Sequence, residues 1–168
     1  MIHERDLDKW DRRFMKLAAE VSTWSKDPST QTGAVVVSPN RQHIALGFNG
    51  FPSRTPDDPA LLNDRNQKYP RIIHCEMNSV RNARGPVDGY TLYTHPCISC
   101  ERCASHMVAY GIARVVCPLP TADMESRWAN LLAMARQIFS EAGVEVVEYL
   151  PENREEPAIQ PNNAVVKG

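Results

Sequence analysis

The feature that most constrains the fold is an alternation of amphipathic segments and short apolar segments along the chain. Residues 6–25 carry an apolar side chain every three or four positions, which predicts a helix. Residues 33–37 and 44–48 are apolar and flank Pro39-Asn40, which predicts a β-hairpin. Three helix–strand units follow. Their helices are expected at 72–83, 100–110 and 123–141, and their strands at 90–94, 113–117 and 144–149.

This order of elements predicts a three-layer α/β/α sandwich around one five-stranded mixed sheet. The last strands should be parallel, because helices connect them and such crossovers are right-handed. Functional sites in these sheets lie at strand ends and helix N-termini. We expect one catalytic domain over residues 1–150. Residues 151–168 are rich in Glu, Asn and Pro, which predicts a flexible C-terminal tail.

The segment between the hairpin and the next predicted helix, residues 49–71, reads as a long loop. It contains four prolines among polar residues, at Pro52, Pro56, Pro59 and Pro70. Long loops inside a compact domain tend to be functional.

Charge and hydropathy exclude several classes of partner. The net charge is −1, so the chain has no overall basic field for a long polyanion, and a small ligand is favoured over nucleic acid. No apolar run approaches the roughly 20 residues that span a bilayer. Residues 1–10 are charged, unlike a signal sequence. We therefore expect a cytoplasmic protein that binds neither nucleic acid nor membrane.

Cysteine spacing points to a metal site. The chain has five cysteines, an odd number, and three of them lie within seven residues. This spacing suits a metal in a reducing compartment better than a disulfide framework. Cys-x-x-Cys occurs in two registers, Cys97–Cys100 and Cys100–Cys103. Cys117 lies in an apolar run and is expected to be buried in the core.

A second group of polar residues lies upstream of the cysteines. His74 and Glu76 are near the start of one predicted helix, and the cysteines are near the start of the next. A hydrolytic zinc site needs three nitrogen or sulfur ligands and one open position, and one His with two Cys meets this need. The positive ends of two helices favour thiolates. Glu76 would then transfer protons to and from the water that zinc activates.

Several segments of the chain together resemble one family. They are Ser25-Lys26-Asp27-Pro28, Gln31-Thr32-Gly33-Ala34, Gly47-Phe48-Asn49-Gly50-Phe51-Pro52, Asp57-Asp58, Lys68-Tyr69-Pro70 and His74-Cys75-Glu76-Met77-Asn78. With His-x-Glu and Cys-x-x-Cys, the signature of zinc deaminases, they resemble the deoxycytidylate deaminase family from the first helix to the last strand. The resemblance implies a cytidine deaminase-like fold, a catalytic Zn²⁺ and hydrolysis of dCMP to dUMP.

The resemblance also addresses the cysteine register. In the family, alanine follows the second cysteine ligand, and Gly-Ile comes about eight residues later. Cys103, with Ala104 and Gly111-Ile112, fits this pattern. The resemblance thus implies His74, Cys100 and Cys103 as zinc ligands, with Cys97 as the alternative.

Four residues are candidates for substrate binding. The resemblance implies that Asn49 contacts the substrate; the alternative is that its amide holds its own turn. Ser25 and Lys26 could bind a 5′-phosphate through a hydroxyl and a point charge, although Lys26 could equally be solvated. Arg127 is a minor candidate for the phosphate or the base.

Regulation is implied by the resemblance alone. Members of the family are often hexamers that dCTP activates and dTTP inhibits, which implies a homo-oligomer, a hexamer or a dimer, and nucleotide effectors accompanied by Mg²⁺. The segment associated with this control includes Gly47, Phe48 and Gly50. Phe48 replaces the tyrosine of the family, and Cys75 replaces its alanine. The Cys75 thiol is either close to the metal or a buried spectator.

Two other functions compete with dCMP deamination. The first is deamination of a modified cytosine nucleotide, such as 5-methyl-dCMP, or of a base in nucleic acid. The balance of 19 basic and 20 acidic residues argues against nucleic acid. The second is a structural zinc module without activity, which would have no need of the carboxylate of Glu76.

Overall fold

The structure is a computed structural model that describes residues 1–154. Residues 155–168, which make up most of the predicted tail, lie outside the described part. The strands are β1 (Ile2–His3), β2 (Gly33–Val37), β3 (Ile44–Phe48), β4 (Thr91–His95), β5 (Arg114–Pro118) and β6 (Glu145–Leu150). The helices are α1 (Lys9–Ser22), α2 (Pro59–Asn63), α3 (Arg65–Lys68), α4 (Cys75–Ala83), α5 (Glu101–Ala109) and α6 (Ala122–Glu141), with a short 3-10 helix at Glu4–Asp6.

Within residues 1–154 the strands form one mixed sheet in the order β1-β6-β5-β4-β2-β3. The predicted hairpin is present as antiparallel β2 and β3, and β4, β5 and β6 are parallel as expected. The prediction of five strands missed β1, which pairs in parallel with β6 through Ile2 and Tyr149. A two-residue strand is too short to show the alternation by which strands are found in a sequence.

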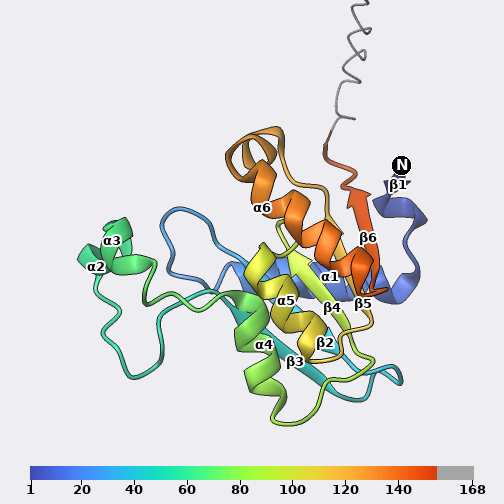
Figure 1. The fold of residues 1–168 in the computed structure, drawn as a ribbon, viewed down its shortest axis with the longest axis horizontal. Coiled ribbons are helices and arrows are strands. Elements are labelled where there is room, and N and C mark those ends of the chain that lie inside the picture. Colours follow the sequence, from blue (N-terminus) through green and yellow to red (C-terminus); the bar gives the residue numbers. More distant parts are fainter. Residues whose placement is uncertain (155–168) are drawn as a thin grey trace, which may run out of the picture.

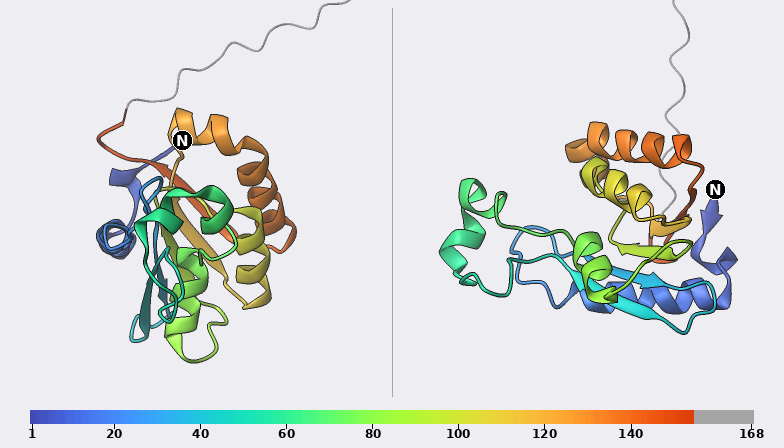
Figure 2. Two further views of the ribbon diagram at one scale, coloured as in Figure 1. Left: turned by 90° about the vertical axis from the view of Figure 1, so that its left-hand side faces the viewer. Right: turned by 60° about the horizontal axis from the view of Figure 1, so that its bottom comes forward.

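Helices cover both faces of the sheet, which confirms the three-layer sandwich. Helix α1 lies on one face, and α4, α5 and α6 lie on the other (Figures 1 and 2). Because successive strand residues point to opposite faces, Val35 packs in the cluster beneath α1 and Val36 in the opposite cluster. With both faces covered, all five residues of β2 are buried.

A glycine in β3 sets the distance between the sheet and α4. A Cβ on Gly47 would come within 2.2 Å of the Ser79 backbone nitrogen and 2.4 Å of the Cys75 carbonyl oxygen. Any larger residue would push α4 away from the sheet. The close contact fixes the first turn of α4 and, with it, the position of His74.

The predicted loop over residues 49–71 contains the two short helices α2 and α3, which project from the sandwich as an arm (Figure 1). Asp58 and Asp64 cap these helices by accepting backbone N–H bonds. Helices of five and four residues are too short to give a helical period, so the prediction missed them.

The arm is closed at its base by two sets of contacts. Gly50 and Ile73 exchange backbone hydrogen bonds of 3.1 and 2.9 Å. Lys68 is buried, and its Nζ lies 3.0 Å from Asp27 Oδ1 and 3.1 Å from Ser29 Oγ. The chain therefore enters and leaves the arm at one point, immediately before His74.

Among the described residues, no helix combines the length and the apolar character needed to cross a membrane.

Candidate active site

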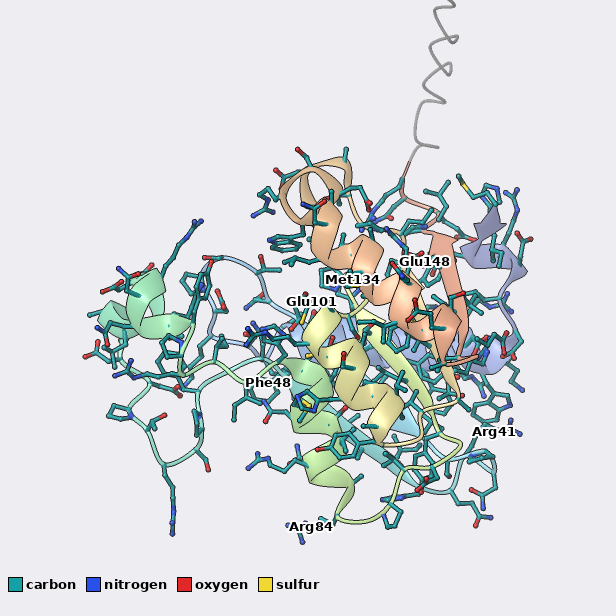
Figure 3. The ribbon with its side chains drawn as sticks, in the orientation of Figure 1. Arg41, Phe48, Arg84, Glu101, Met134 and Glu148 are labelled. Atoms are coloured by element: carbon teal, nitrogen blue, oxygen red, sulfur yellow. The ribbon has the colours of Figure 1, made fainter. Side chains whose placement is uncertain are left out.

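The two predicted groups of metal ligands lie at the starts of two helices. His74 is the N-cap of α4 and Cys100 is the N-cap of α5, and neither side chain makes a capping hydrogen bond. Figure 3 labels Glu101, the first residue of α5, and Phe48, the last residue of β3, on the side of the molecule that faces the arm. Both helix starts therefore offer free N–H groups and a positive end at one site.

The structure brings the three predicted ligands together. His74 Nδ1 lies 3.4 Å from Cys100 Sγ and 3.4 Å from Cys103 Sγ, and one ligand atom from each residue lies within 4.8 Å of the others. Tetrahedral zinc, with bonds of about 2.1 Å to nitrogen and 2.3 Å to sulfur, separates these atoms by about 3.6 Å. The side chains therefore fit zinc in both donor type and spacing.

Cys97 takes no part in this group. Its thiol packs against the cluster beneath α4, α5 and α6, and burial raises its pKa to about 12. Cys117 is fully buried, as expected. His106 is exposed and stacks on Tyr110.

The side chains of His74, Cys100 and Cys103 shift one another's pKa before any metal binds. A hydrogen bond from the Cys103 thiol lowers the pKa of Cys100, so Cys100 is the more acidic thiol of the pair. The same hydrogen bond, together with burial, raises the pKa of Cys103. The bond to Cys100 raises the pKa of His74 to about 9. Binding of a metal would therefore release the protons that remain on these side chains.

Glu76 lies in the first turn of α4, two residues after His74. Its side chain is buried, and its charge acts on His74, Cys100 and Cys103 alike. The Cys75 thiol donates a hydrogen bond of 3.3 Å to Glu76 Oε2. A carboxylate outside the ligand group but beside it is suited to acid–base chemistry at the open metal position.

Ser25 and Asn49 are both buried and hold the loop between α1 and β2. Ser25 Oγ donates to the Asn49 carbonyl oxygen at 2.9 Å. The Asn49 amide donates to the Thr30 carbonyl oxygen at 2.9 Å and accepts from the Thr32 N–H at 2.8 Å. The Asn49 amide therefore holds the backbone of residues 30–32, 17–19 positions away, rather than its own turn, and contact between Ser25 or Asn49 and a substrate stays a prediction.

Lys26 and Arg127 are exposed cations, each paired with one carboxylate. Lys26 Nζ lies 2.7 Å from Asp57 Oδ2. Arg127 pairs with Asp123, and its guanidinium lies 4.8 Å from the ring centre of Trp128. An exposed cation can exchange such a partner for a phosphate at little cost, because surface ion pairs are weak.

The sequence prediction assigned no role to several buried polar groups near the site. Asp27 and Lys68 form a buried ion pair. Both residues lie in segments that resemble the deoxycytidylate deaminase family. Ser99 Oγ and Glu101 Oε2, on either side of Cys100, are buried without a hydrogen-bond partner among the described residues. This resemblance was the signal in the sequence that could have pointed to a role for Asp27 and Lys68.

Comparisons with known proteins agree with this geometry. Residues 8–119 match the family model described as the cytidine and deoxycytidylate deaminase zinc-binding region. An uncharacterized deaminase in the luxG 3′ region of Aliivibrio fischeri is 40% identical over 146 residues, covering 86% of this chain and 96% of that protein. The deoxycytidylate deaminase of Homo sapiens is 29% identical over 154 residues, covering 87% of this chain and 83% of that protein.

Solved structures show the same fold. The dCMP deaminase from the cyanophage S-TIM5 is 22% identical, covering 84% of this chain and 98% of that chain, with TM-scores of 0.65 for the apo form and 0.68 for its complex with dCMP and dUMP. The family model matches well over half of the residues. The chain therefore belongs to the cytidine and deoxycytidylate deaminase family and is a zinc-binding deaminase, a hydrolase.

Proposed function

We propose that this protein hydrolyses dCMP to dUMP and ammonia. The observation that carries the proposal is the group of His74 Nδ1, Cys100 Sγ and Cys103 Sγ at two helix starts, with the buried carboxylate of Glu76 beside it. Relatives named deoxycytidylate deaminase, and a solved neighbour bound to dCMP and dUMP, support the choice of substrate.

His74, Cys100 and Cys103 would hold the zinc. Two thiolates balance the charge of the ion, and three protein ligands leave a fourth position for water. Bound there, zinc supplies a Lewis acid that brings the pKa of water to about 7.

Glu76 would act as the general base and the general acid of the reaction. Its carboxylate takes a proton from water as the oxygen attacks C4 of cytosine, and delivers this proton to N3 of the ring. The same carboxylate then carries the remaining proton of the attacking oxygen to the amino group, the C4–N bond breaks and ammonia leaves. The oxygen of water ends as the 4-carbonyl of dUMP, so the reaction needs no other reactant.

Ser25 and Lys26 are the proposed contacts to the 5′-phosphate, and Asn49 is the proposed contact to the sugar or the base. Arg127 is a further candidate for the phosphate or the base. Both cations have exposed charged ends, as a phosphate contact requires. We further propose a single catalytic domain over residues 1–150 in a cytoplasmic homo-oligomer. Control by dCTP and dTTP with Mg²⁺, through the segment that holds Gly47, Phe48 and Gly50, belongs to the same proposal.

A substrate panel tests the proposal. Purified zinc-loaded protein is assayed with cytidine, deoxycytidine, CMP, dCMP, dCTP and 5-methyl-dCMP, each with and without dCTP and dTTP as effectors. We expect dCMP to be preferred by a wide margin over deoxycytidine. Preference for the unphosphorylated nucleoside would contradict the proposed phosphate contacts. Preference for 5-methyl-dCMP would contradict the proposal that dCMP is the substrate.

Glu76→Gln separates metal binding from proton transfer. The variant is expected to retain one zinc per chain, because Glu76 is outside the ligand group, and to lose about 10²-fold or more in kcat. Zinc content is measured by elemental analysis alongside the rate. Wild-type activity should vanish on chelation and return with zinc. A Glu76→Gln variant with full activity would contradict the assigned role.

A further inference from the structure

Cys75 is a buried nucleophilic group beside the site that the proposed reaction does not use. It is 3% exposed and lies between His74 and Glu76 at the start of α4. Its thiol is not part of the metal-ligand group, which consists of His74, Cys100 and Cys103 among the described residues. The thiol instead donates a hydrogen bond of 3.3 Å to Glu76 Oε2.

The sulfur is held in place from two sides. Helix α4 packs so closely on β3 that a Cβ on Gly47 would lie 2.4 Å from the Cys75 carbonyl oxygen, so the backbone of Cys75 has no room to move toward the sheet. The Thr32 side chain also lies beside the thiol. Thr32 itself is fixed through its N–H, which donates to Asn49 Oδ1 at 2.8 Å.

This arrangement restricts the carboxylate of Glu76. The terminal torsion of a glutamate is broad, so the two oxygens of a free carboxylate exchange places and tilt easily. A donor fixed on Oε2 leaves Oε1 as the oxygen free to face water and the ring. Alanine, the residue that the family resemblance implies at this position, has no donor to offer.

We propose that Cys75 is a positioning residue that orients the carboxylate of Glu76 through its thiol. This inference rests on the proposed deaminase function. The thiol acts as a hydrogen-bond donor, and it neither binds the metal nor contacts the substrate.

Two substitutions test the role in the zinc-loaded enzyme. Cys75→Ala removes the donor and is expected to lower kcat about threefold to tenfold, with KM changed less than about twofold, because a small misplacement of a catalytic group costs rate rather than binding. Cys75→Ser retains a donor of similar size and is expected to restore most of kcat. Cys117→Ala, which removes another fully buried thiol, should leave kcat unchanged.

A spectroscopic measurement reports the contact without turnover. The S–H stretching band of Cys75 is identified in Raman spectra of the zinc-loaded protein as the band lost in Cys75→Ala. Hydrogen bonding to a carboxylate lowers the frequency of this band, so Glu76→Ala is expected to raise it. The band of Cys117, identified in the same way, should not move.

The outcomes separate the two proposals. A wild-type protein without deaminase activity would refute the proposed function, and the positioning role would fall with it. An active wild type with unchanged kcat in Cys75→Ala, or an S–H band that Glu76→Ala does not move, would overturn the inference alone. Loss of zinc in Cys75→Ala would likewise overturn it, because the residue would then support the metal rather than the carboxylate.

Discussion

Replacing Lys68 by methionine is expected to destabilise the protein far more than any exposed lysine replacement. The Lys68 ammonium lies 3.0 Å from Asp27 Oδ1, and the two side chains are 5% and 6% exposed. Methionine fills nearly the same volume without the charge. The substitution therefore leaves the Asp27 carboxylate buried without its cation.

Breaking one partner of a buried ion pair costs about 3–5 kcal/mol of unfolding free energy. The cost here should fall near the lower end, because Asp27 Oδ1 still accepts from the Ser29 N–H at 2.8 Å and the Thr30 N–H at 3.3 Å. For a chain of this size, about 3 kcal/mol corresponds to a decrease in Tm of roughly 6–12 °C.

The assay is urea unfolding of the zinc-loaded protein, followed by tryptophan fluorescence and far-ultraviolet circular dichroism. Lys26→Met is the matched control, because the Lys26–Asp57 pair has side chains that are 68% and 45% exposed and should contribute about 0.5 kcal/mol or less. The double variant Asp27→Asn with Lys68→Met should recover part of the loss, since it removes the unpaired charge. Equal losses in Lys68→Met and Lys26→Met would refute the reasoning.

Three further substitutions probe other features of the fold. Gly47→Ala should cost about 3 kcal/mol or more and weaken zinc affinity, because its Cβ collides with the backbone of α4; unchanged unfolding and zinc titrations would contradict this. Burial raises the pKa of Asp11, but the hydrogen bonds from Arg114 and Tyr93 lower it by more, so the net pKa lies below that of an ordinary aspartate. Its stabilisation should therefore be complete above about pH 4 and disappear as the pH falls through the lowered pKa, so the urea midpoints of wild type and Asp11→Asn should converge in acid. Ser99→Ala removes a buried hydroxyl that has no hydrogen-bond partner within residues 1–154, and it should leave Tm unchanged or raise it, as calorimetry would show.

Periodicity in the sequence predicted the larger elements well. Strands β2 and β3 match their predicted ranges, and the other three predicted strands are each displaced by one residue at both ends. Helix α1 is shorter than predicted because Asp8 caps it. One apolar side chain of α6, Leu131, is 42% exposed. The helix departs from helical geometry at Trp128, which shifts the phase of the residues on either side of the bend.

The grouping of His74, Cys100 and Cys103 could be predicted because the patterns that indicate it are local in sequence. His74 and Glu76 lie two residues apart, and Cys100 and Cys103 are separated by three positions at a helix start, so residue type and spacing carry the information. The choice against Cys97 depended on the family resemblance. The pair between Asp27 and Lys68 joins residues 41 positions apart, and no local pattern encodes such a contact.

The closed base of the arm has a consequence for how this chain can vary. Ile73 pairs with Gly50 through the backbone, and His74 is the next residue. Changes at the far end of the arm should therefore leave the position of His74 unchanged. Because the entropic cost of loop closure rises slowly with length, added residues near Thr55 would lower the free energy of unfolding only slightly. The far end of the arm is thus a suitable place to insert a tag, a reporter or a binding module into this enzyme without moving His74.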